Sequence, residues 1–308
     1  MRELTVPLLE ENRLSRGMIA YLWKEMRPAQ WAKNLTVLAP LLFAQQLFVP
    51  LALGRAVALF GLFCLLSSAA YLFNDLLDYG QDRVHPEKRH RPLAAGHLTR
   101  GTVVGTAGVL YVFVFVSGAI LFGHSVLLIL VGYGLLNLLY SLWLKHQVIL
   151  DVFAIAAGFV LRVVGGAVAV QVEISHWLLI CTTLLALFLG FCKRRHELLT
   201  LGAEADQHRQ VLTEYNPRFL DMMIGIVTAA TVMSYALYTV SEETVQKFQT
   251  EGLLATLPFV LYGIFRYLYL VYHKELGGDP TQQILTDTPL ILNLGLWTLT
   301  VGIILYWR

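Results

Sequence analysis

Long apolar runs follow one another along nearly the whole chain, separated by short polar segments. Each run has about 20 residues, the length that an α-helix needs to cross the hydrocarbon core of a membrane. The runs predict nine transmembrane helices, at residues 34–52, 55–74, 102–122, 125–144, 149–171, 176–192, 219–240, 253–272 and 288–307. We therefore expect an all-α polytopic membrane protein, with an N-terminal arm at residues 1–33 and one nine-helix domain at residues 34–308.

The composition agrees with this pattern. Hydrophobic residues make up 56% of the 308 residues, charged residues only 14%, and the mean hydropathy is +0.61. A soluble domain carries about 25% charged residues, so a soluble protein and a disordered chain are both excluded. The formal net charge of +2 gives no reason to expect a nucleic-acid partner, and the three cysteines lack any metal-binding spacing.

The basic residues predict the orientation. Eighteen of the 23 lysines and arginines fall in the N-terminal arm and in alternate loops. Loops rich in Lys and Arg stay in the cytoplasm. We expect a bacterial inner-membrane protein with a cytoplasmic N-terminus, an external C-terminus, and two long charged cytoplasmic loops at residues 75–101 and 193–218.

The second predicted span runs directly into an acidic cluster. Asp75, Asp78 and Asp82 are spaced at i, i+3 and i+7, and Asn74 lies four residues before Asp78. On a helix the carboxylates share one face and repel one another unless a cation compensates them. Carboxylate and amide oxygens suit Mg²⁺, which binds one or two carboxylates together with substrate phosphates. The cluster predicts a Mg²⁺ site for a diphosphate substrate; a solvated acidic helix end is the alternative.

Basic residues follow the acidic cluster at once. Lys88, Arg89 and Arg91 stand between Pro86 and Pro92, and the prolines interrupt any helix there. The segment can therefore fold back toward the acids, where Arg and Lys would bind the phosphates of the same substrate. A polybasic patch on anionic lipid is the alternative.

These residues resemble the signature of the UbiA superfamily of intramembrane prenyltransferases. Its Asn-Asp-x-x-Asp-x-x-x-Asp run, in the cytoplasmic loop after the second of nine helices, is matched by Asn74, Asp75, Asp78 and Asp82. The resemblance implies a UbiA-like bundle with a cytoplasm-facing cavity and Mg²⁺ as the cofactor. It also implies that the four residues are metal ligands and that the three aspartates are catalytic.

The loop after the sixth helix departs from the aromatic prenyltransferases of this superfamily, which carry a second acidic motif, Asp-x-x-x-Asp, there. This sequence has Lys193-Arg194-Arg195-His196-Glu197, with one acid and three consecutive basic residues. It is more similar to another branch, the decaprenyl-phosphate phosphoribosyltransferases (5-phosphoribosyl-monophosphodecaprenol synthases). Further segments that resemble this branch include Arg27-Pro28-x-Gln30-Trp31-x-Lys33-Asn34 and Gly277-Gly278-Asp279-Pro280.

The resemblance to this branch implies a reaction. Phosphoribosyl pyrophosphate gives its 5-phosphoribose to a polyprenyl (decaprenyl-like) phosphate and releases pyrophosphate, which yields a lipid-linked precursor for cell-envelope polysaccharides. The residues implied in phosphate binding are Lys33, Arg83, Lys88, Arg91, Lys145, Arg162, Lys193 and Arg194. Other residues expected at the cavity are Asn34, Tyr140, Asp151 and Glu197.

Two charged residues, Asp151 and Arg162, fall inside the fifth predicted span, about three helical turns apart and on one face. Ionisable residues inside a membrane are costly and usually functional, so we expect both to face the cavity. The alternative is that Asp151 lies at the cytoplasmic end of the span beside Lys145 and that Arg162 pairs structurally with another helix.

Two other functions would suit a membrane bundle. An aromatic prenyltransferase, with a polyprenyl diphosphate and a 4-hydroxybenzoate-type acceptor, would need more acid in the 193–218 loop. A transporter would show inverted repeats and charge near the membrane midplane, whereas no repeat is visible and the charge concentrates at the cytoplasmic face. A membrane-bound phosphoribosyltransferase is therefore the favoured prediction.

Overall fold

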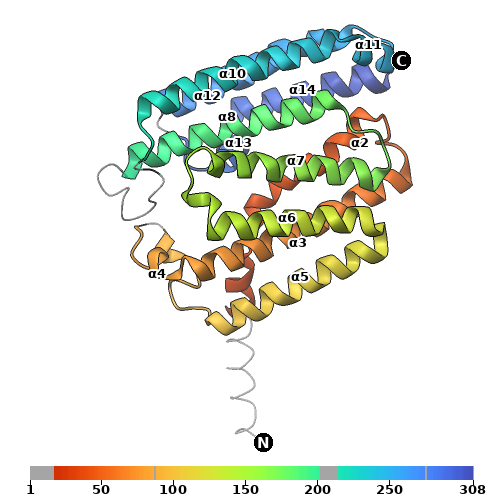
Figure 1. The fold of residues 1–308 in the computed structure, drawn as a ribbon. Coiled ribbons are helices and arrows are strands. Elements are labelled where there is room, and N and C mark those ends of the chain that lie inside the picture. The colour runs from red at the N-terminus through yellow and green to blue at the C-terminus, as the bar shows by residue number, and fades with distance from the viewer. Residues whose placement is uncertain (1–16, 87, 202–211, 213, 275, 308) are drawn as a thin grey trace, which may run out of the picture. The chain divides into compact units, whose positions relative to one another are not determined.

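The computed structural model describes residues 17–86, 88–201, 212, 214–274 and 276–307, and within these residues it is helical, without strands (Figure 1). Eight helical segments of the described chain are long and apolar enough to cross a membrane. They are α3 (Pro50–Leu77), α5 (Arg100–Phe122), α6 (His124–Leu142), α7 (Leu150–Val170), α8 (His176–Leu201), α10 (Pro217–Val240), η6 (Gly252–Thr256) with α12 (Leu257–His273), and α14 (Thr288–Tyr306). The predicted all-α, multi-pass membrane fold is confirmed.

The first predicted span, residues 34–52, is not one continuous helix. Its place is taken by the 3₁₀ helix η1 (Pro28–Leu38) and by α2 (Ala39–Phe43), and α3 already begins at Pro50. A 3₁₀ helix rises about 2.0 Å per residue and an α-helix about 1.5 Å. Residues 28–43 therefore have a combined length of about 30 Å, close to the thickness of the hydrocarbon core. Two short helices thus stand in place of the first predicted span, and the described residues contain eight of the nine predicted spanning helices.

Helices extend into both segments that were predicted as long loops. α3 continues to Leu77 and is followed by α4 (Tyr79–Asp82) and η2 (Lys88–His90). α8 continues to Leu201, so Lys193, Arg194 and Arg195 lie on a helix rather than in a loop. Residues 202–211 and 213 of the predicted 193–218 loop lie outside the described residues, as do residues 1–16 of the arm, whose residues 17–25 form a helix.

The chain forms two compact units, one of residues 1–31 and 61–141 and the other of residues 32–60 and 142–308. In the first unit α5 and α6 are joined by Gly123 alone, whose φ of 80° suits glycine. The helix at residues 17–25 and the residue after it contribute Leu22 and Met26, which pack against a core that includes Leu72 and Leu93. This packing brings the helix at residues 17–25 against the end of α3.

In the second unit, α8 packs against both α7 and α10, and α12 packs against α14. Glycine permits the closest approaches. A Cβ on Gly166 of α7 would lie 2.1 Å from the Val37 carbonyl oxygen of η1, and a Cβ on Gly190 of α8 would lie 2.6 Å from Val152 of α7. Small residues let helix backbones meet at such distances within a membrane. The end of η1 is thereby held against α7.

We predict that Gly166→Ala destabilises the protein by about 1–3 kcal/mol, because the added methyl group meets a backbone carbonyl that cannot move aside. The measurement is the thermal unfolding midpoint in detergent. The matched control is Gly302→Ala on α14, where a Cβ meets nothing within 4 Å. Equal midpoints for the two variants would contradict the close approach.

Candidate active site

The end of α3 positions the acidic cluster. α3 ends at Leu77, but the backbone bonds from Asp78 N to Asn74 O (2.9 Å) and from Asp82 N to Asp78 O (2.8 Å) continue the helical path into α4. Asp75 and Asp82 are almost fully buried, at 2% and 3% exposure. Asp78 takes another partner, because its Oδ2 accepts a hydrogen bond from Asn74 Nδ2 at 2.9 Å. The predicted cluster therefore divides into a buried pair and a separate Asn–Asp pair.

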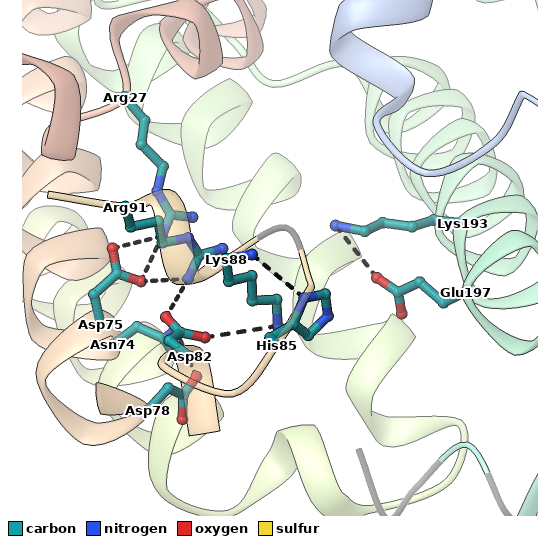
Figure 2. A network of polar contacts seen from close by, with 10 residues as sticks. All are labelled: Arg27, Asn74, Asp75, Asp78, Asp82, His85, Lys88, Arg91, Lys193 and Glu197. Carbon is teal, nitrogen blue, oxygen red and sulfur yellow. Dashed lines mark hydrogen bonds and ion pairs between the residues drawn. The ribbon is translucent and has the colours of Figure 1, made fainter. Parts of the chain in front are cut away.

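Two arginines bond the buried pair (Figure 2). Arg91 Nη1 lies 3.0 Å from Asp75 Oδ1 and 2.5 Å from Asp82 Oδ2, so one nitrogen bridges both acids. Arg27 donates to both carboxylate oxygens of Asp75, and its guanidinium lies 4.9 Å from the centre of the Tyr71 ring. Lys88 Nζ lies 4.0 Å from Asp82 Oδ1. The predicted fold-back of the basic segment onto the acids is therefore seen for Lys88 and Arg91.

Burial sets the electrostatics of this cluster. Loss of water around Asp82 raises the pKa of its carboxyl group, while Arg91 and Lys88 oppose the increase. The neighbouring cations thus offset part of the cost of burying this acid.

The described residues fit a cation that is shared between protein and substrate. No group of three or more His, Cys, Asp or Glu side chains within them is arranged around one metal position. Arg91 Nη1 nevertheless bonds two carboxylates at once, so two acids already surround one positively charged group. Mg²⁺ commonly binds through one or two carboxylates and completes its shell with water and phosphate. Asp75 and Asp82 suit a metal ion whose shell is completed by water and phosphate better than one whose ligands all come from the protein.

A second network joins α7, α8 and Tyr215, which lies just before α10. Arg194 is 1% exposed; its Nε donates to Asp151 Oδ2 at 2.5 Å, and its Nη1 donates to Glu197. The Tyr215 hydroxyl donates to Asp151 Oδ1 at 2.9 Å. Lys193 Nζ lies 3.7 Å from Glu197 Oε1, with about a third of its side chain exposed. Of the two predicted phosphate-binding residues on α8, Lys193 is accessible, whereas Arg194 is buried between two acids.

Tyr215 also supports an unusual backbone. Its hydroxyl oxygen accepts a hydrogen bond of 2.6 Å from the amide of Ile149, whose φ of 70° is rare for a β-branched residue. Burial, and then the nearby Asp151, raise the pKa of Tyr215, so the hydroxyl stays a neutral donor. The start of α7 is therefore held in place by the same network that holds Arg194.

The remaining predicted residues have other surroundings. Arg162 Nε donates to Asn34 Oδ1 at 2.6 Å, so Asp151 and Arg162 bond different partners from the same helix. Arg83 is exposed and lies against the Tyr79 ring. Three further residues are half-buried at separate places, with Lys33 on η1, Tyr140 on α6 and Lys145 on η3 (Leu144–His146).

Sequence reasoning missed several residues of the two networks. Arg27 stands in one of the segments that resemble a known branch, but its spacing from Asp75 carries no signal. Tyr215 has no motif at all. The Gly277-Gly278 pair has a packing role, since a Cβ on Gly277 would lie 2.6 Å from the Cβ of His196, one residue from Glu197.

Comparison with known proteins shows to which family the chain belongs. Residues 34–286 match the model of the UbiA prenyltransferase family. The chain belongs to the UbiA prenyltransferase family. As a member of the UbiA family it is a membrane-bound transferase, and the enzyme class expected from the acidic motif is confirmed.

Individual relatives agree with this assignment. The chain is 31% identical to the decaprenyl-phosphate phosphoribosyltransferase of Mycolicibacterium smegmatis over 94% of each chain. It is 32% identical to that of Corynebacterium glutamicum, over 95% of this chain and 88% of the relative. A solved UbiA homolog from Archaeoglobus fulgidus bound to DMAPP and Mg²⁺ shares the fold, with a TM-score of 0.67, 15% identity, and coverage of 92% and 98%.

We predict that Asp151→Asn lowers the free energy of unfolding by about 3 kcal/mol or more, because Arg194 keeps its burial and loses a charged partner. The matched control is Asp221→Asn, which breaks the pair with Arg195 on the same helix; Asp221 is 41% exposed, so its loss should cost about 1 kcal/mol or less. Thermal unfolding in detergent gives both values. A larger loss for the control would refute the ranking.

Proposed function

We propose that the protein catalyses Mg²⁺-dependent transfer of 5-phosphoribose from phosphoribosyl pyrophosphate to a polyprenyl phosphate of decaprenyl-like length, with release of pyrophosphate. The product would serve the synthesis of cell-envelope polysaccharides. The reaction would take place at the cytoplasmic face of the bacterial inner membrane, with the N-terminus in the cytoplasm, in keeping with the distribution of basic residues.

One observation carries the proposal: the buried carboxylates of Asp75 and Asp82 meet at a single cationic nitrogen, within reach of two more basic side chains. Two acids around one cation suit a metal-bound diphosphate. Arg27, Lys88 and Arg91 then supply donors for the oxygens of that diphosphate.

The network on α8 favours a phosphoribosyl donor over a prenyl diphosphate with an aromatic acceptor. Glu197 is the one acid beside three consecutive basic residues, and both Arg194 and Lys193 pair with it. A carboxylate that is already paired with two cations is poorly suited to hold a second metal ion. Lys193, on the accessible side of this network, is a better candidate for one of the substrate phosphates outside the diphosphate.

The proposed reaction depends little on side chains that transfer protons. An oxygen of the lipid phosphate attacks C1 of the ribose, the bond from C1 to the pyrophosphate oxygen breaks, and the configuration at C1 inverts. The attacking oxygen is already anionic, so no general base is required. Bound Mg²⁺ would stabilise the negative charge on the departing pyrophosphate. Arg27 and Arg91 would orient that group, which supplies the alignment on which the rate depends.

A cavity in the second unit suits the isoprenoid tail of the acceptor. It has a volume of about 360 Å³ and lies between α8, α10, α12 and α14. Its lining is mostly apolar and aromatic, including Trp177, Phe188 and Trp297. Leu185 and Leu294, which also line it, are 44% and 51% exposed on membrane-spanning helices. The cavity is therefore accessible from the lipid-facing surface, where a polyprenyl chain resides.

The test of the reaction is a radiolabel transfer assay with purified protein and Mg²⁺. One tube holds labelled phosphoribosyl pyrophosphate and decaprenyl phosphate; the other holds a labelled polyprenyl diphosphate and 4-hydroxybenzoate. We expect labelled lipid only in the first tube, and none after addition of EDTA. Asp75→Asn should reduce transfer about 100-fold or more, as for loss of one preorganised electrostatic group.

Glu242→Gln is the matched control, because Glu242 is an exposed acid on α11 (Glu242–Phe248). This variant should keep full activity. A labelled product only in the second tube would refute the phosphoribosyl reaction and assign the protein to aromatic prenyl transfer.

We predict a chain-length effect when the cavity is narrowed. Cys181 lines the cavity, and Cys181→Phe should raise KM for decaprenyl phosphate about 10-fold, from an overpacking cost of about 1–3 kcal/mol. A ten-carbon prenyl phosphate should keep its KM, because its tail is too short to fill the cavity. Met233→Phe, at a lipid-exposed position of α10, is the control. Equal changes for both acceptors would exclude the cavity as the tail site.

A further inference from the structure

Glu25 is a buried acid without a bonded partner. It lies at the end of the helix at residues 17–25, is 2% exposed, and neither carboxylate oxygen has a hydrogen-bond partner of ordinary geometry. An isolated buried carboxylate is among the most costly groups that a protein can contain. The other buried acids of the described chain, Asp75, Asp82 and Asp151, all bond arginines. The bonds in this conformation therefore do not explain why the Glu25 carboxylate is buried.

The surroundings of Glu25 connect it to the acidic cluster. Burial is the main cause that raises its pKa to about 7, and the charge on Asp75 raises it further. The Leu93 amide, Arg27 and Arg91 partly offset this increase. Glu25 thus lies within electrostatic range of one buried aspartate and of both arginines of the cluster.

Arg27 is held in a strained conformation two residues away. Its φ of 53° is in the left-handed region, which costs a residue other than glycine about 1–2 kcal/mol. Its bonds to both oxygens of Asp75, and the Tyr71 ring beneath its guanidinium, oppose that cost. Strained residues of this kind are typical of sites that change state. Arg27 occupies the carboxylate oxygens that a divalent cation would use.

We propose that Glu25 is the alternative partner of Arg27: when a divalent cation takes the oxygens of Asp75, the Arg27 guanidinium leaves them and pairs with Glu25. Glu25 is then a positioning residue that acts through Arg27 and is not itself a metal ligand. The proposal rests on the proposed use of a metal at Asp75.

The exchange explains why an unpaired acid is placed beside a paired one. A cation that displaces Arg27 would otherwise leave a guanidinium in a mostly buried position without a counter-charge, and this cost would weaken metal binding. With Glu25 present, the displaced arginine meets a carboxylate whose own burial then becomes compensated. The cost of separating Arg27 from Asp75 is offset by the gain from pairing Glu25, and Arg27 remains beside the site.

A double-mutant cycle on Mn²⁺ binding tests the exchange. Full-length protein in detergent is titrated with Mn²⁺ alone, and free Mn²⁺ is read by electron paramagnetic resonance. We expect Glu25→Gln to weaken binding about 10-fold and Glu25→Asp to recover most of the loss. Arg27→Gln should tighten binding, because the competing guanidinium is gone. In the Arg27→Gln background, Glu25→Gln should change the affinity less than two-fold.

The outcomes separate three roles. An equal loss from Glu25→Gln in both backgrounds would overturn the proposal, since Glu25 would then act on the metal directly. No loss in either background would also overturn it, and would leave Glu25 with a structural role. Because the readout is binding, failure of phosphoribosyl transfer in the radiolabel assay would not affect it. Absence of saturable Mn²⁺ binding by the unmodified protein would refute the metal site and the exchange together.

Discussion

Compensation of buried charge is the constraint on which both polar networks depend. An ionised side chain removed from water is costly unless an opposite charge and hydrogen bonds replace the water. In this apolar chain the compensation comes from arginine: Asp75 and Asp82 share Arg91, and Asp151 bonds Arg194. Arginine suits this task, because its planar guanidinium presents several donors and stays charged when buried. Helix ends that carry these residues are therefore positioned by ion pairs as well as by packing.

Arginine–carboxylate pairs occur in both networks, and the two networks differ in the solvent exposure of their arginines. The side chains of Arg27 and Arg91 are each 25% exposed, so a substrate can reach them and compete for them. Arg194 is 1% exposed and bonds two acids, and its network also fixes the strained amide of Ile149 through Tyr215. The exposure of the first arrangement suits the exchange of partners proposed for Arg27, whereas the buried second arrangement holds α7, α8 and the segment before α10 together.

Sequence reasoning recovered what depends on composition and on local spacing. Apolar runs predicted the eight long helices, and the prolines around the basic segment predicted that it folds back toward the acids. Hydropathy reports the length of a run but not its helical pitch, so the 3₁₀ form of η1 and its contact with Gly166 were not predictable. The partners Arg27 and Tyr215 lie 48 and 64 residues from the aspartates that they bond. Such pairs arise from tertiary packing, as does the burial of Arg194.

Charge balance in the acidic cluster supports joint binding of the proposed metal and diphosphate. The described cluster holds three acids, Asp75, Asp78 and Asp82, and three bases, Arg27, Lys88 and Arg91, and Glu25 lies within electrostatic range as a fourth acid. Even with Glu25 ionised, a divalent cation would leave one positive charge uncompensated, which the low-exposure environment penalises. A diphosphate would bring the missing negative charge and give the arginines new acceptors in place of the carboxylates. Each ligand would therefore lower the cost of binding the other.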